Sequence, residues 1–172
     1  MDTHVKPVVY ESLSSKSLFF STQDVQSKMD LLQPDALQFE YTRIMMGFLL
    51  HQPQPRRIAM LGLGGGSLAK FCYRYLPDAD ITVVEINPHV IARRSDFLVP
   101  ADDQRFRVVQ VDAADFVRTI ETRQGSQIAA LEEIAFNEGW IDRETLLQSA
   151  QRYGKSPYGQ HLMHVAEGKI RY

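Results

Sequence analysis

The sequence lacks several features that would place it in a class at once. Cysteine occurs once in 172 residues, which excludes a disulfide scaffold and an all-cysteine zinc site and is typical of a reducing compartment. No apolar run approaches the ~18 residues of a membrane span. The N-terminus also lacks the basic segment and following apolar segment of a secretion signal. We therefore expect a cytoplasmic protein with no membrane partner.

An excess of charge of one sign is also absent. The 19 Lys and Arg residues balance 21 Asp and Glu residues, for a formal net charge of −2. Because nucleic-acid binders carry a basic excess, we expect no nucleic-acid partner. His161 and His164 are i, i+3 neighbours without a third ligand candidate, so they indicate surface or interface residues and no metal site. What is present, 44% apolar residues, suffices for one domain or a domain with an appendage.

Residues 1–55 are predicted to form a small β unit and a helix. Val5–Tyr10 and Ser17–Ser21 have strand composition and are separated by Ser-rich turn chemistry. Asp35–Leu50 has helical periodicity, with Asp35 as its cap. The helix would bury one apolar face, formed by Leu37, Tyr41, Ile44, Met45 and Phe48.

Residues 56–115 alternate between strands and helices. Strands are predicted at 57–62, 81–86 and 106–111, and helices at 67–75 and 88–97. Such alternation indicates βαβ units and a parallel sheet, in which right-handed crossovers give the spatial order 3-2-1. The predicted fold class is therefore α/β, with a partial Rossmann-like parallel sheet of three strands.

Residues 116–172 contain no long strand pattern and are predicted to be a helical tail. Helices are expected at 129–137, 143–153 and 157–167, with Asp142 and Ser156 as N-caps. A glycine follows each helix, at Gly139, Gly154 and Gly168. This sequel is unusual, because a parallel sheet normally continues with further strands. The outer edge of the strand at 57–62 would stay without a partner strand, which invites association into a homo-oligomer; the alternative is that the helical tail packs over this edge.

The segment Gly62-Leu-Gly-Gly-Gly66 lies between the first strand of this sheet and the helix after it. Glycine lets a turn adopt positive φ and lets a ligand approach the backbone, and the helix that follows presents free N–H groups. Ser67 stands where a dinucleotide fingerprint has its third glycine, which weakens the pyrophosphate interpretation. No Gly-Lys-Ser/Thr follows, so the turn is not a P-loop.

Two carboxylates follow the next two strands. Glu85 ends the second strand, 23 residues after Gly62, where a carboxylate can accept both hydrogen bonds of a ribose diol. Asp112 ends the third strand and could accept a hydrogen bond from adenine N6. A glycine turn and two carboxylates on three successive strand ends predict a site for an adenosyl ligand.

Over about residues 8–115 the chain resembles the spermidine synthase-like family, the polyamine aminopropyltransferases and their relatives. The matching segments are Asp24–Asp30, Leu37–Met46, Met60–Ser67, Val84–Pro88 and Val111–Ala113. The resemblance implies a small N-terminal β unit, a seven-stranded methyltransferase-type sheet, and S-adenosylmethionine or its decarboxylated form as cofactor. It also implies the cofactor-binding residues: Gly62, Gly64 and Gly66 along the cofactor, Glu85 at the ribose, Asp112 and Ala113 beside adenine, and Gln26 as a further contact.

The family pattern is incomplete in this chain. The family's fourth strand and the catalytic Asp after it are missing, and the turn lacks the acid that helps bind the amine. Arg43 and Gly47 stand where polyamine synthases have a Glu and a His. We therefore assign no catalytic residue and expect the aminopropyl transfer of the family to be lost.

From about Phe116 the chain resembles the C-terminal tail of glucose-1-phosphate thymidylyltransferases. The matching segments are Phe116–Gly125, Leu131–Ala135, Gly139–Asp142 and Pro157–Leu162. The family's tail is helical and lies outside the catalytic core, and the resemblance places Glu133 and Ile134 at the edge of a secondary nucleotide site. The two resemblances meet within residues 112–119, so the sequence is interpreted as a chimera.

Three functions stay open from the sequence. The first is a spermidine synthase-like transferase that acts on a small-molecule amine. The second is a non-catalytic or vestigial module that keeps part of the adenosyl site. The third is a thymidylyltransferase-related fragment of nucleotide-sugar metabolism, although the N-terminal nucleotide loop and metal-binding Asp residues of that family have no counterpart here.

Overall fold

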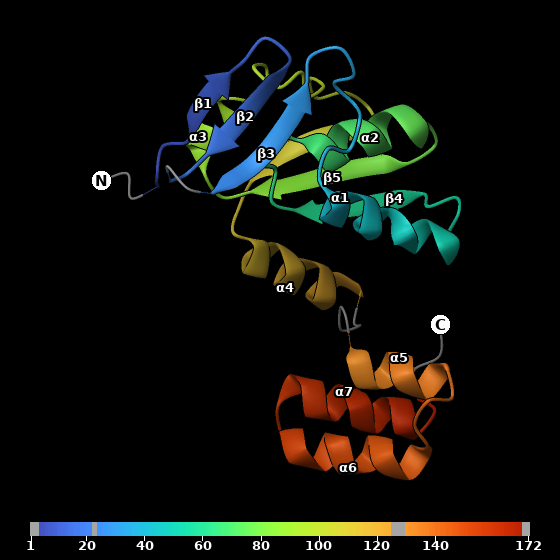
Figure 1. Ribbon diagram of the computed structural model, residues 1–172. Coiled ribbons are helices and arrows are strands. Elements are labelled where there is room, and N and C mark those ends of the chain that lie inside the picture. Colours follow the sequence, from blue (N-terminus) through green and yellow to red (C-terminus); the bar gives the residue numbers. More distant parts are fainter. Residues whose placement is uncertain (1–3, 22–23, 125–129, 170–172) are drawn as a thin grey trace. The chain divides into compact units, whose positions relative to one another are not determined.

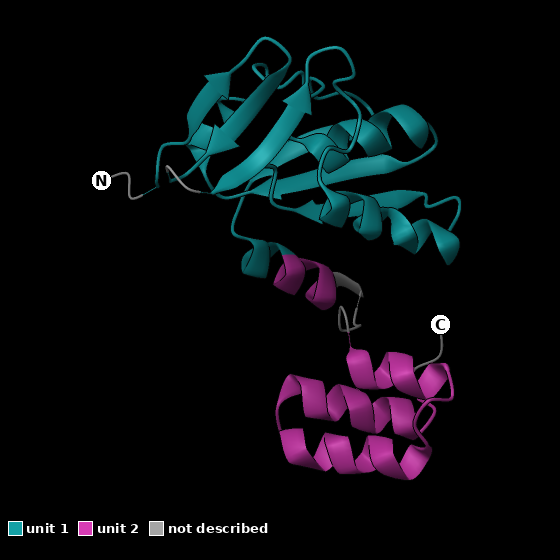
Figure 2. Cartoon of the chain, viewed as in Figure 1, with its two compact units in different colours: residues 1–116 teal, residues 117–172 magenta. Residues whose placement is uncertain are grey.

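The computed structural model describes residues 4–21, 24–124 and 130–169. The chain divides into two compact units, residues 1–116 and residues 117–172, and the division falls inside helix α4 (Ala113–Gln124) (Figure 2). Each unit has its own hydrophobic core. No helix in the described part of the chain is long and apolar enough to cross a membrane.

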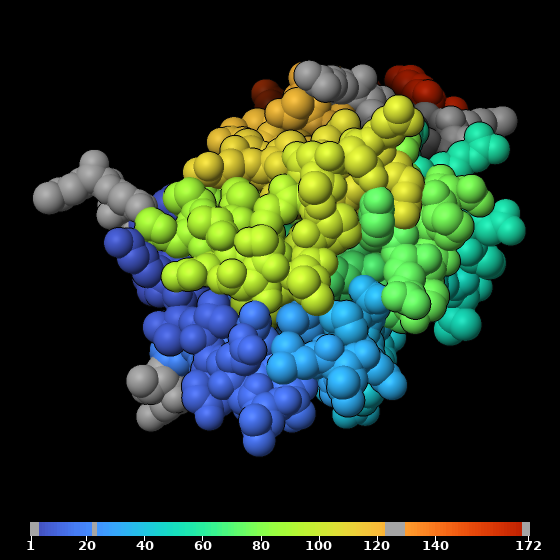
Figure 3. Space-filling view, turned by 90° about the horizontal axis from the view of Figure 1, so that it is seen from above, coloured from blue at the N-terminus to red at the C-terminus, as the bar shows by residue number. Residues whose placement is uncertain are grey.

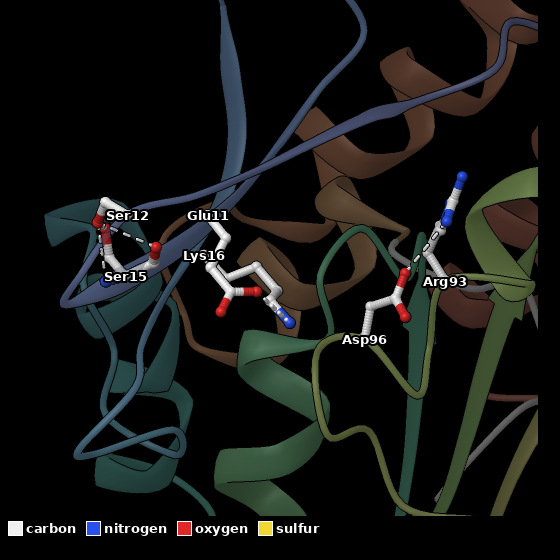
Figure 4. A network of polar contacts seen from close by, with 6 residues as sticks. All are labelled: Glu11, Ser12, Ser15, Lys16, Arg93 and Asp96. Carbon is white, nitrogen blue, oxygen red and sulfur yellow. Dashed lines mark hydrogen bonds and ion pairs between the residues drawn. The ribbon is translucent and has the colours of Figure 1, made fainter.

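The first unit begins with three antiparallel strands, β1 (Val8–Glu11), β2 (Ser15–Phe19) and β3 (Val25–Asp30), in that order across the sheet (Figure 1). The Oγ atom of Ser12 accepts a hydrogen bond from the backbone N–H of Ser15 at 3.0 Å and so closes the first turn. Beside it, Lys16 forms an ion pair with Glu11 at 2.9 Å (Figure 4). The two predicted strands are therefore present, with shifted ends.

The sequence does not predict β3, because its residues are mostly polar. Only Ser27 and Met29 of this strand are buried. Their alternation marks one inward face, but two residues are too few to stand out in a pattern search. The strand pairs with β2 in an antiparallel register that shifts between Leu18 and Phe19.

The helix predicted at 35–50 begins later than expected. α1 spans Glu40–Met45, and a 3₁₀ helix, η1, continues over Met46–Leu50. Asp35 does not cap α1, because it lies in a turn five residues before the helix and Phe39 holds the N-cap position. The carboxylate of Asp35 pairs with the guanidinium of Arg74 at 2.7 Å.

The predicted core face of this helix is also wrong. Tyr41, Ile44 and Met45 are 54%, 70% and 53% exposed. Met46, in contrast, packs against the core of the first unit. The sequence pattern is that of a covered helix, yet within the described residues the apolar face of α1 is uncovered.

The parallel sheet has the predicted strands and the predicted order. β4 (Arg57–Leu61), β5 (Asp80–Glu85) and β6 (Phe106–Gln110) lie in the order β4-β5-β6, with β4 at one edge (Figure 1). α2 (Ser67–Tyr75) has the predicted ends. α3 (Pro88–Ile91) stops well before residue 97, and turns with i→i−3 hydrogen bonds follow it. The α/β fold class is confirmed.

One core joins the two sheets of the first unit. It contains Leu18 and Met29 from the antiparallel strands together with buried residues of α2, β5, β6 and the segment after α3: Ala69, Cys72, Ile81, Val83, Phe97, Val99 and Phe106. The side-chain amide of Asn87 also donates to the carbonyl of Val5 at 2.8 Å. Figure 3 shows the N-terminal strands and the segment after β5 side by side on one face.

The second unit consists of helices, as predicted. α5 (Leu131–Asn137), α6 (Arg143–Tyr153) and α7 (Pro157–Ala166) pack around a core that includes Leu146 and Leu162. Both predicted N-caps are present, and glycines with positive φ follow the helices. The start predicted at Ala129 lies outside the described residues. No strand occurs among the described residues after 116, as predicted. The helix α4, in contrast, is not predicted from the sequence.

His161, predicted to be a surface or interface residue, is buried within this unit. The side chains of Glu133 and His161 meet at 2.6 Å between α5 and α7, and both residues are buried. A surface position is therefore wrong for His161, because each of the two buried polar groups finds its partner in the other.

Candidate functional site

The glycine turn between β4 and α2 is shaped by contacts with its own protein. Gly66 is the N-cap of α2 with a φ of +68°, and a Cβ there would lie 2.3 Å from Cγ2 of Val99. A Cβ on Gly65 would lie 2.7 Å from Cβ of Ser27. Only glycine fits at these two positions. Gly62, with a φ of +94°, has open space where its Cβ would be.

Most backbone N–H groups of the turn already have acceptors within the protein. The N–H of Gly62 donates to the carbonyl of Val84 at 2.7 Å, and the N–H of Gly66 donates to the carbonyl of Leu63 at 2.8 Å. The N–H of Leu63 donates to Glu85 and the N–H of Gly65 to Ser27, each at 2.9 Å. A phosphate cradle needs free N–H groups, so this turn is poorly suited to a pyrophosphate.

Glu85 lies against the glycine turn, at the end of β5. Its Oε2 accepts the Leu63 N–H at 2.9 Å, and its Oε1 accepts the N–H of Asn87 at 2.8 Å. The residue is half-buried. A carboxylate oxygen has two lone pairs, so each oxygen can still accept one more hydrogen bond. Glu85 therefore ties the ends of β4 and β5 together and keeps the capacity to bind a diol.

Asp112 lies two residues beyond β6 and is exposed. Its Oδ1 accepts the N–H of Ala114 at 2.7 Å and, more weakly, the N–H of Asp115 at 3.4 Å. Asp112 thus stands as a cap before α4, which begins at Ala113. The strand order places the ends of β4, β5 and β6 side by side, so the turn, Glu85 and Asp112 follow three adjacent strands.

Gln26 is exposed on β3, whereas its neighbour Ser27 is buried against the glycine turn. Successive side chains of a strand point to opposite faces, which accounts for the difference. The sequence interpretation named Gln26 and missed Ser27. The signal that could have found Ser27 is its i, i+2 relation to the buried Met29.

Lys70, on α2, is buried and stabilises the segment that packs against the glycine turn. The residue is only 2% exposed, and its Nζ donates to the carbonyl of Phe97 at 2.8 Å. Burial lowers the pKa of Lys70 from 10.5 to about 8, and the negative charge of Asp35 partly opposes this shift. The bond holds the Phe97–Val99 segment against Gly65 and Gly66.

Cys72 is buried on the same helix, and burial raises the pKa of its thiol to about 11, which makes it unreactive.

A groove of about 540 Å³ runs along β4 and ends at Gly62. Its lining is mainly apolar and comes from α1, η1, β4 and α2: Met45, Met46, Phe48, Ile58, Met60 and Leu68. Glu85 and Asp112 do not line it. Within the described residues, no group of three or more His, Cys, Asp or Glu side chains is placed to hold a metal ion.

No family model matches the chain. A polyamine aminopropyltransferase of Chromobacterium violaceum is 44% identical over 111 residues, which is 64% of this chain and 42% of that protein. A glucose-1-phosphate thymidylyltransferase of Mycobacterium tuberculosis is 51% identical over 57 residues, which is 33% of this chain and 20% of that protein. The chain therefore spans less than half the length of the first relative and about a fifth of the second.

The fold comparison points the same way for part of the chain. The crystal structure of a probable spermidine synthase from Corynebacterium glutamicum superposes with a TM-score of 0.55 and 21% identity, over 64% of this chain and 43% of that one. This likeness shows the fold. The chain thus has two partial homologies, to polyamine aminopropyltransferases and to glucose-1-phosphate thymidylyltransferases, which confirms both resemblances and is consistent with a chimeric or fragment architecture.

Proposed function

We propose that the carboxyl-terminal ends of β4, β5 and β6 bind an adenosyl ligand, S-adenosylmethionine or its decarboxylated form, and that the chain does not transfer an aminopropyl group. The observation that carries this proposal is the 2.9 Å hydrogen bond from the Leu63 N–H to Glu85. This hydrogen bond holds the carboxylate of Glu85, at the end of β5, against the glycine turn that follows the neighbouring strand β4. This is the arrangement in which a carboxylate meets the hydroxyls of a ribose.

The hydrogen-bond state of the turn favours an adenosyl sulfonium ligand over a dinucleotide. A dinucleotide presents a pyrophosphate to this place, but the N–H groups of Leu63 and Gly65 already donate to side chains. An adenosyl ligand needs only the diol acceptor and an adenine partner. In this proposal Glu85 binds the diol, Asp112 and Ala113 lie beside adenine, and Gly62, Gly64 and Gly66 border the ligand. Gln26 is the most distant of the proposed contacts.

The absence of transfer follows from what the reaction needs. An acceptor amine must be held in line with the carbon attached to the sulfonium, and such positioning contributes up to ~7–11 kcal/mol. The sequence offers no acid for the amine in the turn and no counterpart of the catalytic Asp. The chain also matches only 42% of the polyamine aminopropyltransferase that it resembles. A small-molecule amine substrate therefore belongs to the homologous proteins, and we propose none for this chain.

Calorimetry tests the proposal with three ligands: S-adenosylmethionine, its decarboxylated form and thymidine triphosphate. We expect binding of an adenosyl ligand, its loss in Glu85→Ala, and unchanged binding in Glu138→Gln, an exposed acidic position of the second unit. We also expect no product from putrescine and decarboxylated S-adenosylmethionine. Turnover that Glu85→Ala abolishes would show that transfer survives and contradict this part of the proposal.

A second candidate, a nucleotide-binding module of the thymidylyltransferase kind, is favoured by the 51% identity over 57 residues. The structure adds a complication, because the buried carboxylate of Glu133 is engaged by His161. Ile134 is 46% exposed and stays the better edge residue for such a site. Binding of thymidine triphosphate alone would reverse the ranking of the two candidates. A cytoplasmic location is part of our proposal, since the single cysteine is typical of a reducing compartment.

A further inference from the structure

The glycine turn is held by two side chains that come from different sheets. The N–H of Leu63 donates to Oε2 of Glu85, at the end of β5, and the N–H of Gly65 donates to Oγ of Ser27, on β3, each at 2.9 Å. β5 belongs to the parallel sheet and β3 to the antiparallel sheet. The N-terminal strands therefore contact the turn at which we propose that the adenosyl ligand binds.

Ser27 lies against two successive residues of this turn. A Cβ on Gly64 would lie 3.0 Å from Oγ of Ser27, and a Cβ on Gly65 would lie 2.7 Å from Cβ of Ser27. Ser27 and Gly65 are both buried, so solvent offers no ready substitute for the bond between them. Because a buried N–H that loses its acceptor is costly, the hydroxyl oxygen of Ser27 stabilises this one conformation of the turn.

A hydroxyl is not the group that core packing alone would favour at residue 27. Ser27 shares the inward face of β3 with Met29 and stands opposite Leu18 of β2 in the strand register. Met29 and Leu18 are core residues, 2% and 0% exposed. A polar group in such surroundings costs free energy unless it forms a hydrogen bond, and Ser27 forms it with Gly65. The hydroxyl therefore serves the glycine turn and not the core.

The bond at Gly65 also restrains Leu63, two residues earlier in the chain. Gly64 lies between them with a φ of +53°, and glycine has more backbone freedom than any other residue. Two acceptors, one on each side of Gly64, remove that freedom. If the Gly65 end is released, the N–H of Leu63 can leave Glu85, and the carboxylate then loses one of the two N–H groups that orient it.

We propose that Ser27 is a positioning residue of the adenosyl site, because its Oγ holds the glycine turn in the conformation that orients Glu85 toward the ribose diol. This inference rests on the proposed function, in which Glu85 binds the diol. Ser27 contacts the turn and not the ligand, so it acts through the fraction of molecules whose turn is ready to bind. As that fraction falls, the apparent dissociation constant rises in proportion.

Calorimetry with S-adenosylmethionine and its decarboxylated form measures the effect on binding. Ser27→Ala removes the acceptor, and we expect the affinity to fall roughly tenfold. Ser27→Cys keeps the shape of serine with a weaker acceptor, so its loss should be smaller. Ser17→Ala is the matched control, because Ser17 is also buried but precedes Leu18 on β2 and so belongs to the opposite face of the sheet. Its affinity should equal that of the wild type.

NMR without ligand provides the readout that a merely structural role would not change. In folded Ser27→Ala the amide signals of Gly65 and Leu63 should both shift, and the side-chain carboxyl signal of Glu85 should shift with them. Leu63 and Glu85 form their bond with each other, so shifts at these two residues report a change in the turn itself. In Ser17→Ala all three signals should keep their positions.

Two results would overturn this inference alone. One is adenosyl binding by Ser27→Ala that equals the wild type, and the other is a Gly65 signal that shifts while those of Leu63 and Glu85 stay in place. Wild-type protein that binds neither adenosyl ligand would overturn the proposed function, and the role of Ser27 toward a ligand with it. Thermal unfolding checks that each variant is folded during the titrations, and Ser27→Cys keeps the test decisive if Ser27→Ala fails to fold.

Discussion

The two units of this protein differ in how their backbone N–H and C=O groups find hydrogen-bond partners. In the helical unit the backbone hydrogen bonds of the described residues are local, within a helix or the turn that follows it, and side chains such as Asp142 and Ser156 satisfy the helix starts. In the α/β unit the backbone of each strand needs a neighbour, and β4 has one on a single side. Helical backbone hydrogen bonds are therefore satisfied within the element, whereas those of a strand require a neighbouring strand.

The largest effect is expected at Gly66, where the α/β unit is packed most tightly. In Gly66→Ala the new Cβ would lie 2.3 Å from Val99 Cγ2 in a backbone conformation with a φ of +68°, which should cost about 4 kcal/mol of unfolding free energy. Gly139→Ala in the helical unit meets no atom within 4 Å at a φ of +73° and should cost about 1 kcal/mol. Urea unfolding followed by NMR signals of each unit measures both. Equal costs would mean that the Phe97–Val99 segment moves aside freely.

A second prediction concerns the independence of the two cores. Leu162 is fully buried in the helical unit, so Leu162→Ala should remove about 3 kcal/mol of stability from that unit. The amide signals of β4, β5 and β6 should keep their positions and their unfolding midpoint. Leu131→Ala changes a side chain that is 71% exposed and should shift stability by less than about 0.5 kcal/mol. Loss of both units together in Leu162→Ala would show that they fold as one.

A pH prediction applies to the α/β unit, through Lys70. Its pKa is about 8 in the folded protein and 10.5 ordinarily, so between these values the unfolded chain binds more protons. Stability attributable to Lys70 therefore rises with pH in this window, by up to about 1.4 kcal/mol per pH unit, and has no slope below it.

Comparison with Lys70→Met isolates this effect. Cys72, whose pKa is raised to about 11, contributes the opposite slope to wild type and variant alike, so it cancels in the difference. Denaturant unfolding at several pH values measures that difference. A difference between the two proteins that stays constant from pH 7 to pH 10 would show that Lys70 keeps an ordinary pKa.

The smallest effect is expected at a hydrogen bond between α5 and α7. The hydroxyl of Tyr158 donates to Glu132, and burial together with this carboxylate raises the pKa of Tyr158 to about 12. Tyr158→Phe should lower the stability of the helical unit by about 1 kcal/mol. Tyr153 donates to the same carboxylate at 3.1 Å from a more exposed position, so Tyr153→Phe should cost less. The reverse order would mean that Tyr153 carries the contact.

The outcome of the sequence predictions follows the same division between local and non-local structure. The ends of α2 and α6 match the predicted ends, because nearby residues mark each boundary: Gly66 and Pro77 flank α2, and Asp142 and Gly154 flank α6. The predicted start of the 35–50 helix is wrong, because residues 34–35 form a turn and α1 begins only at Glu40. β3 has too few buried residues to be recognised before its partner strand is known.

For the candidate site, the sequence placed the glycine turn, Glu85 and Asp112 on three strand ends, and the strand order brings those ends together. It did not reveal that Glu85 binds two backbone N–H groups or that Ser27 holds the turn. The contact from Leu63 to Glu85 and the contact from Gly65 to Ser27 join residues 22 and 38 positions apart, and no short motif encodes them. The ligand assignments of Gln26, the three glycines and Ala113 stay predictions.

By itself the sequence determined most of the elements and the caps of α6 and α7, because hydrophobic periodicity and capping side chains act over a few residues. It also determined the order of the parallel sheet, since right-handed crossovers leave little choice. Only the tertiary structure decided which polar groups form hydrogen bonds inside the protein, such as those of Lys70, Glu133 and the amides of the glycine turn. Burial and the pairing of distant groups depend on the assembled chain, and a local pattern cannot specify them.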